Sequence, residues 1–150
     1  FLFSTTSAQL CIEGDCENKN GTVINADGSK YTGSFVNGKS HGHGILEYRN
    51  GDKYEGSFSE GLFHGYGIYY WSNGDIYKGE FFQGMKHGKG NIKYSQGEEY
   101  TGEFSNDLQH GNGSCTIRSL GRIDTFSIGL ADKREFKKVS CSWQNGKLID

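Results

Sequence analysis

Four regularly spaced histidines are the residues of this sequence best suited to chemistry. His41, His64, His87 and His110 each precede a Gly-x-Gly triplet, and they recur every 23 residues. Imidazole is a common metal ligand and a common general base near neutral pH. Either role requires side chains that converge on one point. Whether the histidines have a chemical or a structural role therefore depends on how the elements that carry them are spaced.

A glycine- and lysine-rich segment, residues 84–90 (GMKHGKG), has some features of a phosphate-binding loop. Its spacing is one residue short, Gly90 stands where a Ser or Thr would contact magnesium, and no helix is expected after it. No nucleophile, base and acid stand out as a set elsewhere in the chain. We therefore predict no catalytic residue, no cofactor-binding residue and no metal ligand, and a protein that is not an enzyme.

The four cysteines are Cys11, Cys16, Cys115 and Cys141. Cys11 and Cys16 are a candidate disulfide that would close a short loop, although four cysteines allow three pairings and the sequence does not choose among them. A zinc site is a poorer interpretation because no CxxC pair is present. Cys115 occupies a repeat position that carries hydrophobic residues in the other copies, which favours a small buried side chain.

The first nine residues, FLFSTTSAQ, have the character of a signal-peptide tail with a cleavage point near Ala8 or Gln9. This interpretation favours an exported or cell-envelope protein over a cytoplasmic one. The alternative is a frayed terminus or a partial first strand. No apolar run approaches the ~20 residues that a transmembrane helix needs.

Two triplets, Asn20-Gly21-Thr22 and Asn112-Gly113-Ser114, match the acceptor sequence for N-glycosylation. Both fall at repeat positions. The sequence alone therefore favours coincidence.

Positive charge is concentrated in one cluster, formed by Lys133, Arg134, Lys137 and Lys138. The cluster is a candidate contact for acidic lipid head groups, and a solvated turn and strand edge is the alternative. The formal net charge of −2 gives no general attraction to anionic lipid and argues against a nucleic-acid partner.

A repeat of 23 residues organises the chain. Six positions, in the order Tyr, Gly, Phe, His, Gly and Gly, are identical in four successive copies, and a partial copy precedes them. Such self-similarity at a fixed period is the signature of a repeat architecture. The copies begin at Tyr31, Tyr54, Tyr77 and Tyr100.

Each repeat predicts two antiparallel strands. Tyr-x-Gly-x-Phe alternates in the manner of a half-buried strand, and Gly-x-Gly-x-Φ-x-Φ, where Φ is hydrophobic, supplies the second. Turn pairs such as Asn37-Gly38 and Asn73-Gly74 separate them. The 24 glycines interrupt every window long enough for an amphipathic helix. The predicted fold is all-β: an elongated, single-layer antiparallel array of β-hairpins.

Glycine within a strand leaves backbone bare, and an aromatic ring on a neighbouring strand can cover it. We expect the Tyr and Phe rings of the first strand to cover the glycine pair of the second, and the sheet to curl into a trough. The trough is a candidate binding surface for an extended peptide or a ring-shaped ligand, unless covering glycine leaves the rings no open surface. The rings are Tyr31, Phe35, Tyr54, Phe58, Tyr77, Phe81, Tyr100 and Phe104.

This arrangement decides the role of the histidines. Two strands per repeat place equivalent residues about 10 Å apart, whereas the ligands of one zinc ion each lie ~2 Å from the metal. Histidines of successive repeats therefore cannot share a metal. We expect each to pack or hydrogen-bond beside its turn.

Residues 54–67 and 77–90 closely resemble the MORN-repeat consensus. The resemblance implies a twisted sheet of β-hairpins that is generally non-catalytic. It also implies roles in protein association, dimerisation, scaffolding or phospholipid binding, sometimes as a region fused to an enzyme.

The predicted organisation has three parts. Residues 1–15 are an N-terminal segment, and residues 16–120 are the array, with a partial repeat at 16–30. Residues 121–150 depart from the pattern and read as degenerate capping strands. Within them, residues 143–147 (WQNGK) are similar to residues 35–39 (FVNGK), which suggests a damaged extra repeat.

The sequence thus predicts a non-catalytic scaffold or protein-interaction module with a protein as its partner. One alternative is a peripheral membrane module that binds acidic phospholipid head groups. Another is the accessory repeat region of an enzyme whose catalytic domain lies elsewhere. Open sheet edges would also allow homo-oligomers by strand addition.

Overall fold

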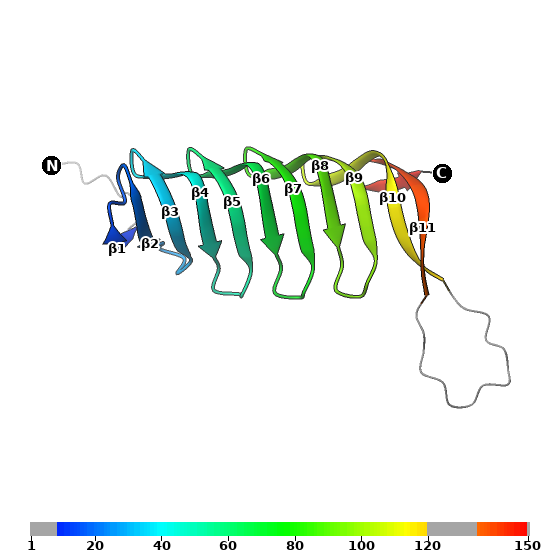
Figure 1. Ribbon diagram of the computed structural model, residues 1–150, viewed down its shortest axis with the longest axis horizontal. Coiled ribbons are helices and arrows are strands. Elements are labelled where there is room, and N and C mark those ends of the chain that lie inside the picture. Colours follow the sequence, from blue (N-terminus) through cyan, green and yellow to red (C-terminus); the bar gives the residue numbers. More distant parts are fainter. Residues whose placement is uncertain (1–8, 120–134, 150) are drawn as a thin grey trace, which may run out of the picture.

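The computed structural model describes residues 9–119 and 135–149, and these form one antiparallel sheet (Figure 1). Over the described residues the sheet has 12 strands in chain order, each hydrogen-bonded only to its sequence neighbours, and no helix. The predicted all-β, single-sheet hairpin array is confirmed. The strands are β1 (Leu10–Gly14), β2 (Asn20–Ile24), β3 (Lys30–Val36), β4 (Lys39–Glu47), β5 (Lys53–Ser59), β6 (Leu62–Tyr70), β7 (Ile76–Phe82), β8 (Met85–Lys93), β9 (Glu99–Ser105), β10 (Leu108–Ser119), β11 (Glu135–Gln144) and β12 (Lys147–Ile149).

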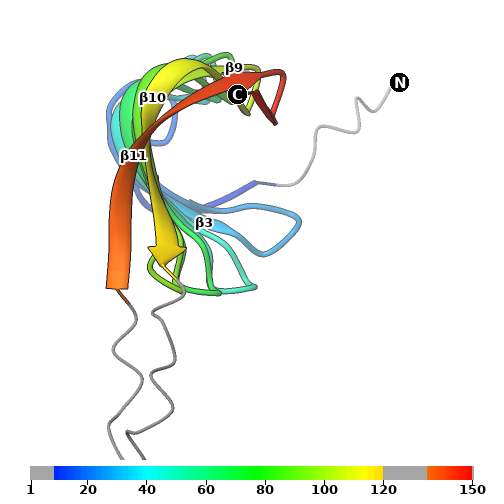
Figure 2. The same cartoon turned by 90° about the vertical axis from the view of Figure 1, so that its right-hand side faces the viewer.

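The sheet curls about its long axis into an open trough, which is seen end-on in Figure 2. Its strand register explains the curl. Gly56 of β5 lies opposite Gly44 of β4 and Gly67 of β6, and the same pairing recurs in every repeat, so a row of glycines crosses the sheet. Because these positions lack side chains, the inner face can bend inward along the row.

Tyrosine rings lie on this glycine row. A Cβ added to Gly67 would approach Cε2 of Tyr54 to 2.6 Å, and one added to Gly56 would lie 2.7 Å from the hydroxyl oxygen of the same ring. Each tyrosine thus covers one glycine of its own strand and one of the next. The expectation that both glycines of the second strand are covered was wrong. Gly65 has φ +68°, and a Cβ added there would meet only Ser57, 3.5 Å from its Cβ, and no ring.

The uncovered glycine belongs to a β-bulge. The register of β5 and β6 shifts between Gly56 and Phe58, and Gly65 adopts the left-handed conformation that this bulge requires. The bulge takes the carbonyl of Ser57 out of the regular ladder, and the hydroxyl of Tyr54 donates a hydrogen bond to it at 2.8 Å. This bond explains why the repeat uses tyrosine, since phenylalanine would leave the carbonyl without that donor.

The two ends of each repeat are closed by different turns. At one end a two-residue turn places both residues at positive φ, as at Asn37 (50°) and Gly38 (69°), the geometry of a type I′ hairpin. At the other end the loop is longer, and only its glycine, such as Gly74 at 92°, has positive φ.

Carboxylates link these longer loops from one repeat to the next. Asp52 accepts hydrogen bonds from the backbone N–H of Ser72 at 2.8 Å and from the hydroxyl of Tyr69 at 3.1 Å. Asp75 accepts the equivalent bond from the N–H of Ser95 at 2.8 Å. The bond from Ser72 is the main reason that the pKa of Asp52 lies below its ordinary value of 3.8.

Replacing Asp52 with asparagine should lower the free energy of unfolding by about 1 kcal/mol at neutral pH, because a charged acceptor is lost. The folded state holds the Asp52 pKa below that of the unfolded state, so this stabilisation is present above pH 3.8 and is lost as the pH falls through the folded pKa. Urea unfolding at neutral and acid pH measures the difference, which should shrink in acid. Glu47→Gln, at an exposed ion pair, is the control and should have little effect. If Asp52→Asn lowered the free energy of unfolding equally at neutral and acid pH, the charge of Asp52 would not be the source of the stabilisation.

Strand β11 takes the place of the first strand of a fifth repeat. Trp143 lies opposite Gly111 and Cys141 opposite Gly113, the register that Phe104 and Gly102 have against Gly88 and Gly90. The turn at residues 145 and 146 again has both φ values positive. Of the predicted capping strands at 121–150, residues 121–134 and 150 lie outside the described residues.

Candidate functional site

The eight rings predicted to form a binding surface are buried. Tyr54 and Tyr77 are 0% exposed, and the other six are at most 5% exposed. Phe35 packs edge-on against Tyr31 of its own repeat. Each later phenylalanine packs edge-on against the tyrosine of its own repeat and that of the preceding repeat, as Phe58 does at 5.1 Å from Tyr54 and 4.9 Å from Tyr31. The rings therefore form the core of the sheet, and the prediction that they present the open binding surface was wrong.

Burial also removes the tyrosines from chemistry near neutral pH. Loss of hydration raises the pKa of Tyr31 to about 12 and raises the pKa values of Tyr54 and Tyr77 as well. These hydroxyl groups donate hydrogen bonds to backbone carbonyls and stay protonated. Their role is structural.

The accessible wall of the trough comes from the second strands and the loops that follow them. Tyr48, Tyr69, Trp71 and Tyr94 are half-buried, and all but Tyr48 pack against the core. The rings of Tyr69 and Trp71 lie 4.7 Å apart, and those of Tyr48 and Tyr69 lie 6.2 Å apart. These residues occupy the hydrophobic positions of the pattern Gly-x-Gly-x-Φ-x-Φ, and the sequence analysis did not select them as a binding surface.

One cation lies within this aromatic wall. Nζ of Lys86 is 5.3 Å from the centre of the Trp71 ring and 5.9 Å from that of Tyr77, and it pairs with Asp107 at 3.5 Å. Its side chain is only 16% exposed. Contacts of this kind fix the ammonium group over the ring faces.

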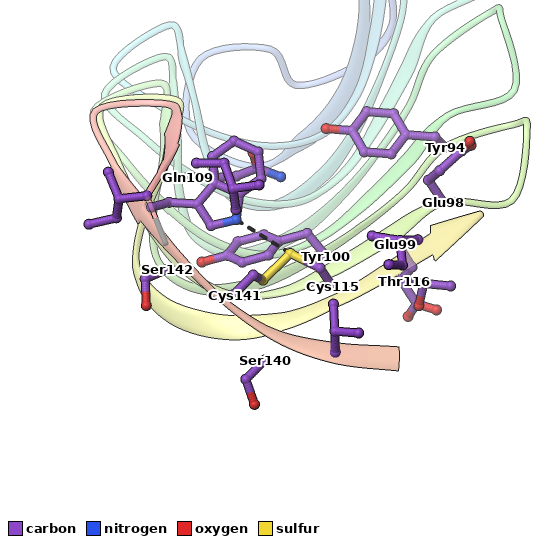
Figure 3. A pocket seen from close by; sticks show the side chains of 15 residues that line it. Tyr94, Glu98, Glu99, Tyr100, Gln109, Cys115, Thr116, Ser140, Cys141 and Ser142 are labelled. Carbon is purple, nitrogen blue, oxygen red and sulfur yellow. Dashed lines mark hydrogen bonds between the residues drawn. A yellow bond between two sulfur atoms is a disulfide. The ribbon is translucent and has the colours of Figure 1, made fainter. Parts of the chain in front are cut away.

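The trough deepens into an apolar hollow of about 620 Å³ at its C-terminal end (Figure 3). It is lined by Trp143 and Val139 of β11, Ile117 of β10, Tyr100 of β9 and Leu148 of β12. The hollow lies where the array stops being regular, because the fifth repeat contributes only β11 and the short β12.

A disulfide between Cys115 and Cys141 lies in the wall of this hollow. Val139 stands at the tyrosine position of the repeat and has no ring to lay over the glycine row, which leaves room for Cys141 at the glycine position. The indole N–H of Trp143 contacts the Cys115 sulfur at 3.4 Å. Cys115 is buried as expected, at 8% exposed, but the interpretation of it as a simple hydrophobic side chain missed the disulfide.

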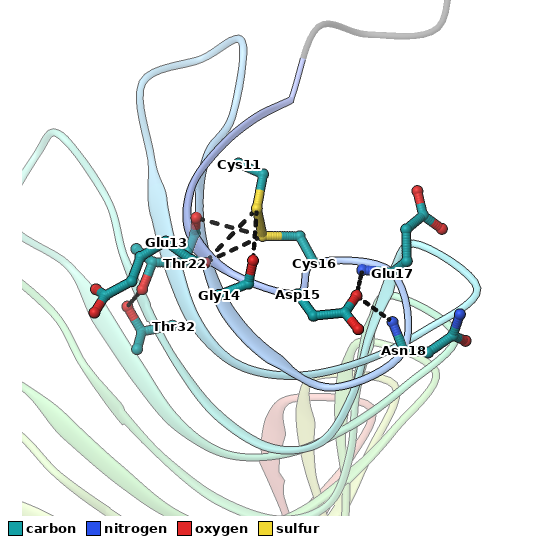
Figure 4. Close-up of a disulfide and its surroundings, with 9 residues drawn as sticks. All are labelled: Cys11, Glu13, Gly14, Asp15, Cys16, Glu17, Asn18, Thr22 and Thr32. Carbon is teal, nitrogen blue, oxygen red and sulfur yellow. Dashed lines mark hydrogen bonds between the residues drawn. A yellow bond between two sulfur atoms is a disulfide. The ribbon is translucent and has the colours of Figure 1, made fainter.

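The second disulfide joins Cys11 to Cys16 at the opposite end of the sheet (Figure 4). A Cβ at Gly21 would lie 2.7 Å from the Cys16 sulfur, so the sulfur covers the glycine row where the central repeats use a ring. At the N-terminal end a disulfide sulfur therefore takes the place of the tyrosine ring, whereas at the C-terminal end Cys141 takes the place of the glycine.

The MORN-repeat family model matches four consecutive segments, residues 31–53, 54–76, 77–99 and 100–122. These begin at the four tyrosines that open the repeats. The chain belongs to the MORN-repeat family. MORN repeats are generally modules for interaction with proteins or membranes.

Two other comparisons add little to this assignment. No curated protein matches the MORN chain. Among solved structures, it is similar to the TCP domain of SAS-4 (dCPAP) of Drosophila melanogaster, which was solved in complex with a proline-rich motif of Ana2 (dSTIL). The identity is 14%, the match covers 81% of this chain and 73% of that chain, and the TM-score is 0.47.

The histidines of the MORN array do not converge. His64 and His87 pack on either side of the Phe82 ring, with ring centres 5.4 Å and 5.9 Å from it. Nδ1 of His41 and of His110 is buried without a hydrogen-bond partner among the described residues. Within residues 9–119 and 135–149, no three potential metal ligands come together.

The predicted lipid-contact cluster is only partly visible. Lys133 and Arg134 lie outside the described residues. Lys137 and Lys138 are exposed on β11, and because they are consecutive residues of a strand, they point to opposite faces of the sheet. In the described part of the MORN chain, no helix is long and apolar enough to cross a membrane.

Proposed function

We propose that this chain is a non-catalytic scaffold that holds an extended segment of a protein partner in its trough. The observation that carries this proposal is the path of half-buried aromatic side chains along the trough, which consists of Tyr48, Tyr69, Trp71 and Tyr94, the last of which also lines the apolar hollow. The path follows the long axis of the sheet, which suits an extended chain better than a compact small molecule. MORN membership supports an interaction role.

The chemistry of the wall indicates the character of the partner. The side chains of the hollow are mainly apolar, and Ile117 is 47% exposed there. An aliphatic or aromatic side chain of the partner would bury itself against this surface. Full burial of one such side chain contributes about 1.5–3 kcal/mol, enough to anchor a segment whose remaining contacts run along the aromatic path.

Selection of peptides from a random library on the immobilised chain tests this proposal. Selected peptides should carry apolar anchor residues, and their binding should survive high salt because few charges contribute. Ile117→Asp places a charge in the hollow and should weaken binding by roughly 10- to 100-fold. Titration calorimetry measures the affinity.

The matched control is Tyr66→Ser, which removes an exposed ring (61% exposed) from the opposite face of the sheet. It should leave peptide affinity unchanged. If Tyr66→Ser weakened peptide binding and Ile117→Asp did not, the trough would be excluded as the binding site.

Vesicles of acidic phospholipid separate this proposal from a membrane role. A scaffold of the proposed kind should bind them weakly. Strong binding that disappears at raised salt and in the Lys137→Glu, Lys138→Glu double variant would replace the protein-binding proposal with a lipid-binding one.

A further inference from the structure

Two asparagines on the outer face of the sheet share a chemical setting. Asn20 of β2 and Asn112 of β10 occupy the same position of the repeat, four periods apart, each directly before a glycine of the glycine row. Each is followed two residues later by a hydroxyl residue, Thr22 or Ser114. We propose that Asn20 and Asn112 are sites of N-linked glycosylation.

The three intervening repeats differ at both positions of the triplet. They carry His43, Tyr66 and Lys89 in place of the asparagine, and none has Ser or Thr two residues later. The repeat consensus therefore fixes only the central glycine. Asparagine and hydroxyl occur together at the two ends of the array alone, and so the repeat does not account for the triplets.

Both side chains are exposed and similarly held. The carboxamide oxygen of Asn20 accepts a hydrogen bond from the hydroxyl of Ser34 at 2.8 Å, and that of Asn112 accepts one from the hydroxyl of Ser142 at 2.8 Å. These bonds leave each Nδ2 without a protein acceptor among the described residues. A sugar on Nδ2 would thus displace no protein contact.

The surface beside each asparagine has room for a sugar. Asn20 borders a shallow depression of about 580 Å³ with bare backbone at Gly33 and Gly44, and Asn112 borders one of about 440 Å³ with bare backbone at Gly90 and Gly102. Both lie on the face opposite the trough, because strand neighbours of the glycine row point outward. Glycans there would leave the trough open to a partner.

The cysteines indicate a compartment where this modification takes place. All four are paired in the structure, and no free cysteine is found. Disulfides persist in the oxidising secretory route, which also supplies the sugar donor, a lipid-diphosphate oligosaccharide. In the transfer, Nδ2 bonds to the anomeric carbon and gives up one proton. The bond between that carbon and the diphosphate oxygen breaks, and the lipid diphosphate leaves with the electron pair.

Expression of the full chain behind a secretory leader in a eukaryotic cell tests the proposal. Both the medium and the cell lysate are analysed, so retention of the protein hides no product. Peptide-N-glycosidase should remove two glycans and convert Asn20 and Asn112 to aspartate in peptide maps. Asn20→Gln and Asn112→Gln should each lose one glycan, and the double variant both.

Ser114 provides a matched pair of variants that leave Asn112 in place. Ser114→Ala removes the acceptor triplet and should abolish modification of Asn112, whereas Ser114→Thr should retain it. Protein with both disulfides formed and both asparagines unmodified would overturn the proposal. Modification at one asparagine alone would support that site and overturn the other.

Discussion

Gly67→Ala is expected to lower the free energy of unfolding by roughly 2–3 kcal/mol, the upper part of the range for overpacked sites. The new methyl group would overlap the ring of Tyr54, which cannot retreat. Phe63 stacks on the Tyr54 ring with centres 3.8 Å apart, and the Tyr54 hydroxyl donates a hydrogen bond to the Ser57 carbonyl. Urea unfolding monitored by tryptophan fluorescence measures the loss.

A double-mutant cycle isolates the contact between ring and glycine. Tyr54→Ala alone should cost about 3–5 kcal/mol, as truncation of a buried aromatic ring usually does. In that background Gly67→Ala should cost little, because the obstructing ring is gone, and the two effects should be strongly non-additive. Additive effects would show that the ring does not restrict Gly67.

Gly61→Ala separates overlap from backbone strain. Gly61 has φ +86° and nothing within 4 Å of an added Cβ, so alanine there meets only the 1–2 kcal/mol penalty of the left-handed conformation. Its effect should not depend on Tyr54. If the effect of Gly61→Ala on the free energy of unfolding also depended on Tyr54, the result would indicate a general loss of sheet stability.

Raising the pH above 10 is expected to unfold the array. The pKa of Tyr31 is raised to about 12 by burial, and those of Tyr54, Tyr77 and Tyr100 are raised for the same reason. The unfolded chain ionises near pH 10, so the stabilisation is complete below pH 10 and is lost as the pH rises through the folded pKa. Tyr31, Tyr54 and Tyr77 each remove about 1.4 kcal/mol by about pH 11. The three together remove about 4 kcal/mol, a large part of the total stability of many domains.

Tyr54→Phe provides the decisive comparison for this alkaline transition. At neutral pH the variant should be about 1 kcal/mol less stable, since the Ser57 carbonyl loses its donor. It also loses one ionisable group, so its stability should fall less steeply with pH, and the two curves should cross near pH 11. Denaturant unfolding at a series of pH values, with tyrosinate absorbance as the probe of ionisation, measures both curves. Parallel curves would mean that Tyr54 does not ionise on unfolding.

The strand pattern was predictable because the same residue types meet in every repeat. Tyr54, Gly56 and Phe58 alternate, and the period of 23 residues fixes which residues lie opposite them. The bulge was harder to anticipate. Gly65 and Gly67 look equivalent in sequence, yet only Gly65 adopts positive φ. Alternation counted across a bulge places the residues on one side of it on the wrong face.

The disulfide between Cys115 and Cys141 could have been predicted from the similarity of residues 143–147 to residues 35–39, although the sequence analysis did not use it in this way. Alignment of residues 143–147 with residues 35–39 places Cys141 at the position of Gly33, and it lies opposite Gly113, two residues from Cys115 on the same strand. The accessible surface of the trough could not be obtained in this way. It depends on how far the sheet curls and on contacts between repeats, such as that of Lys86 with Trp71, which no period within a single repeat specifies.

The pairing of every strand with its sequence neighbours alone gives the molecule a particular mechanical behaviour. A pulling force on the two ends would peel strands one at a time, as a zip opens, and would never have to shear many hydrogen bonds at once. Cys115 and Cys141 are separated by 26 positions in the sequence, and their crosslink withholds this stretch from extension, roughly 90 Å of contour length. Under tension the array would lengthen in hairpin-sized steps. A reducing agent would break the disulfide and add the contour length that it closes off.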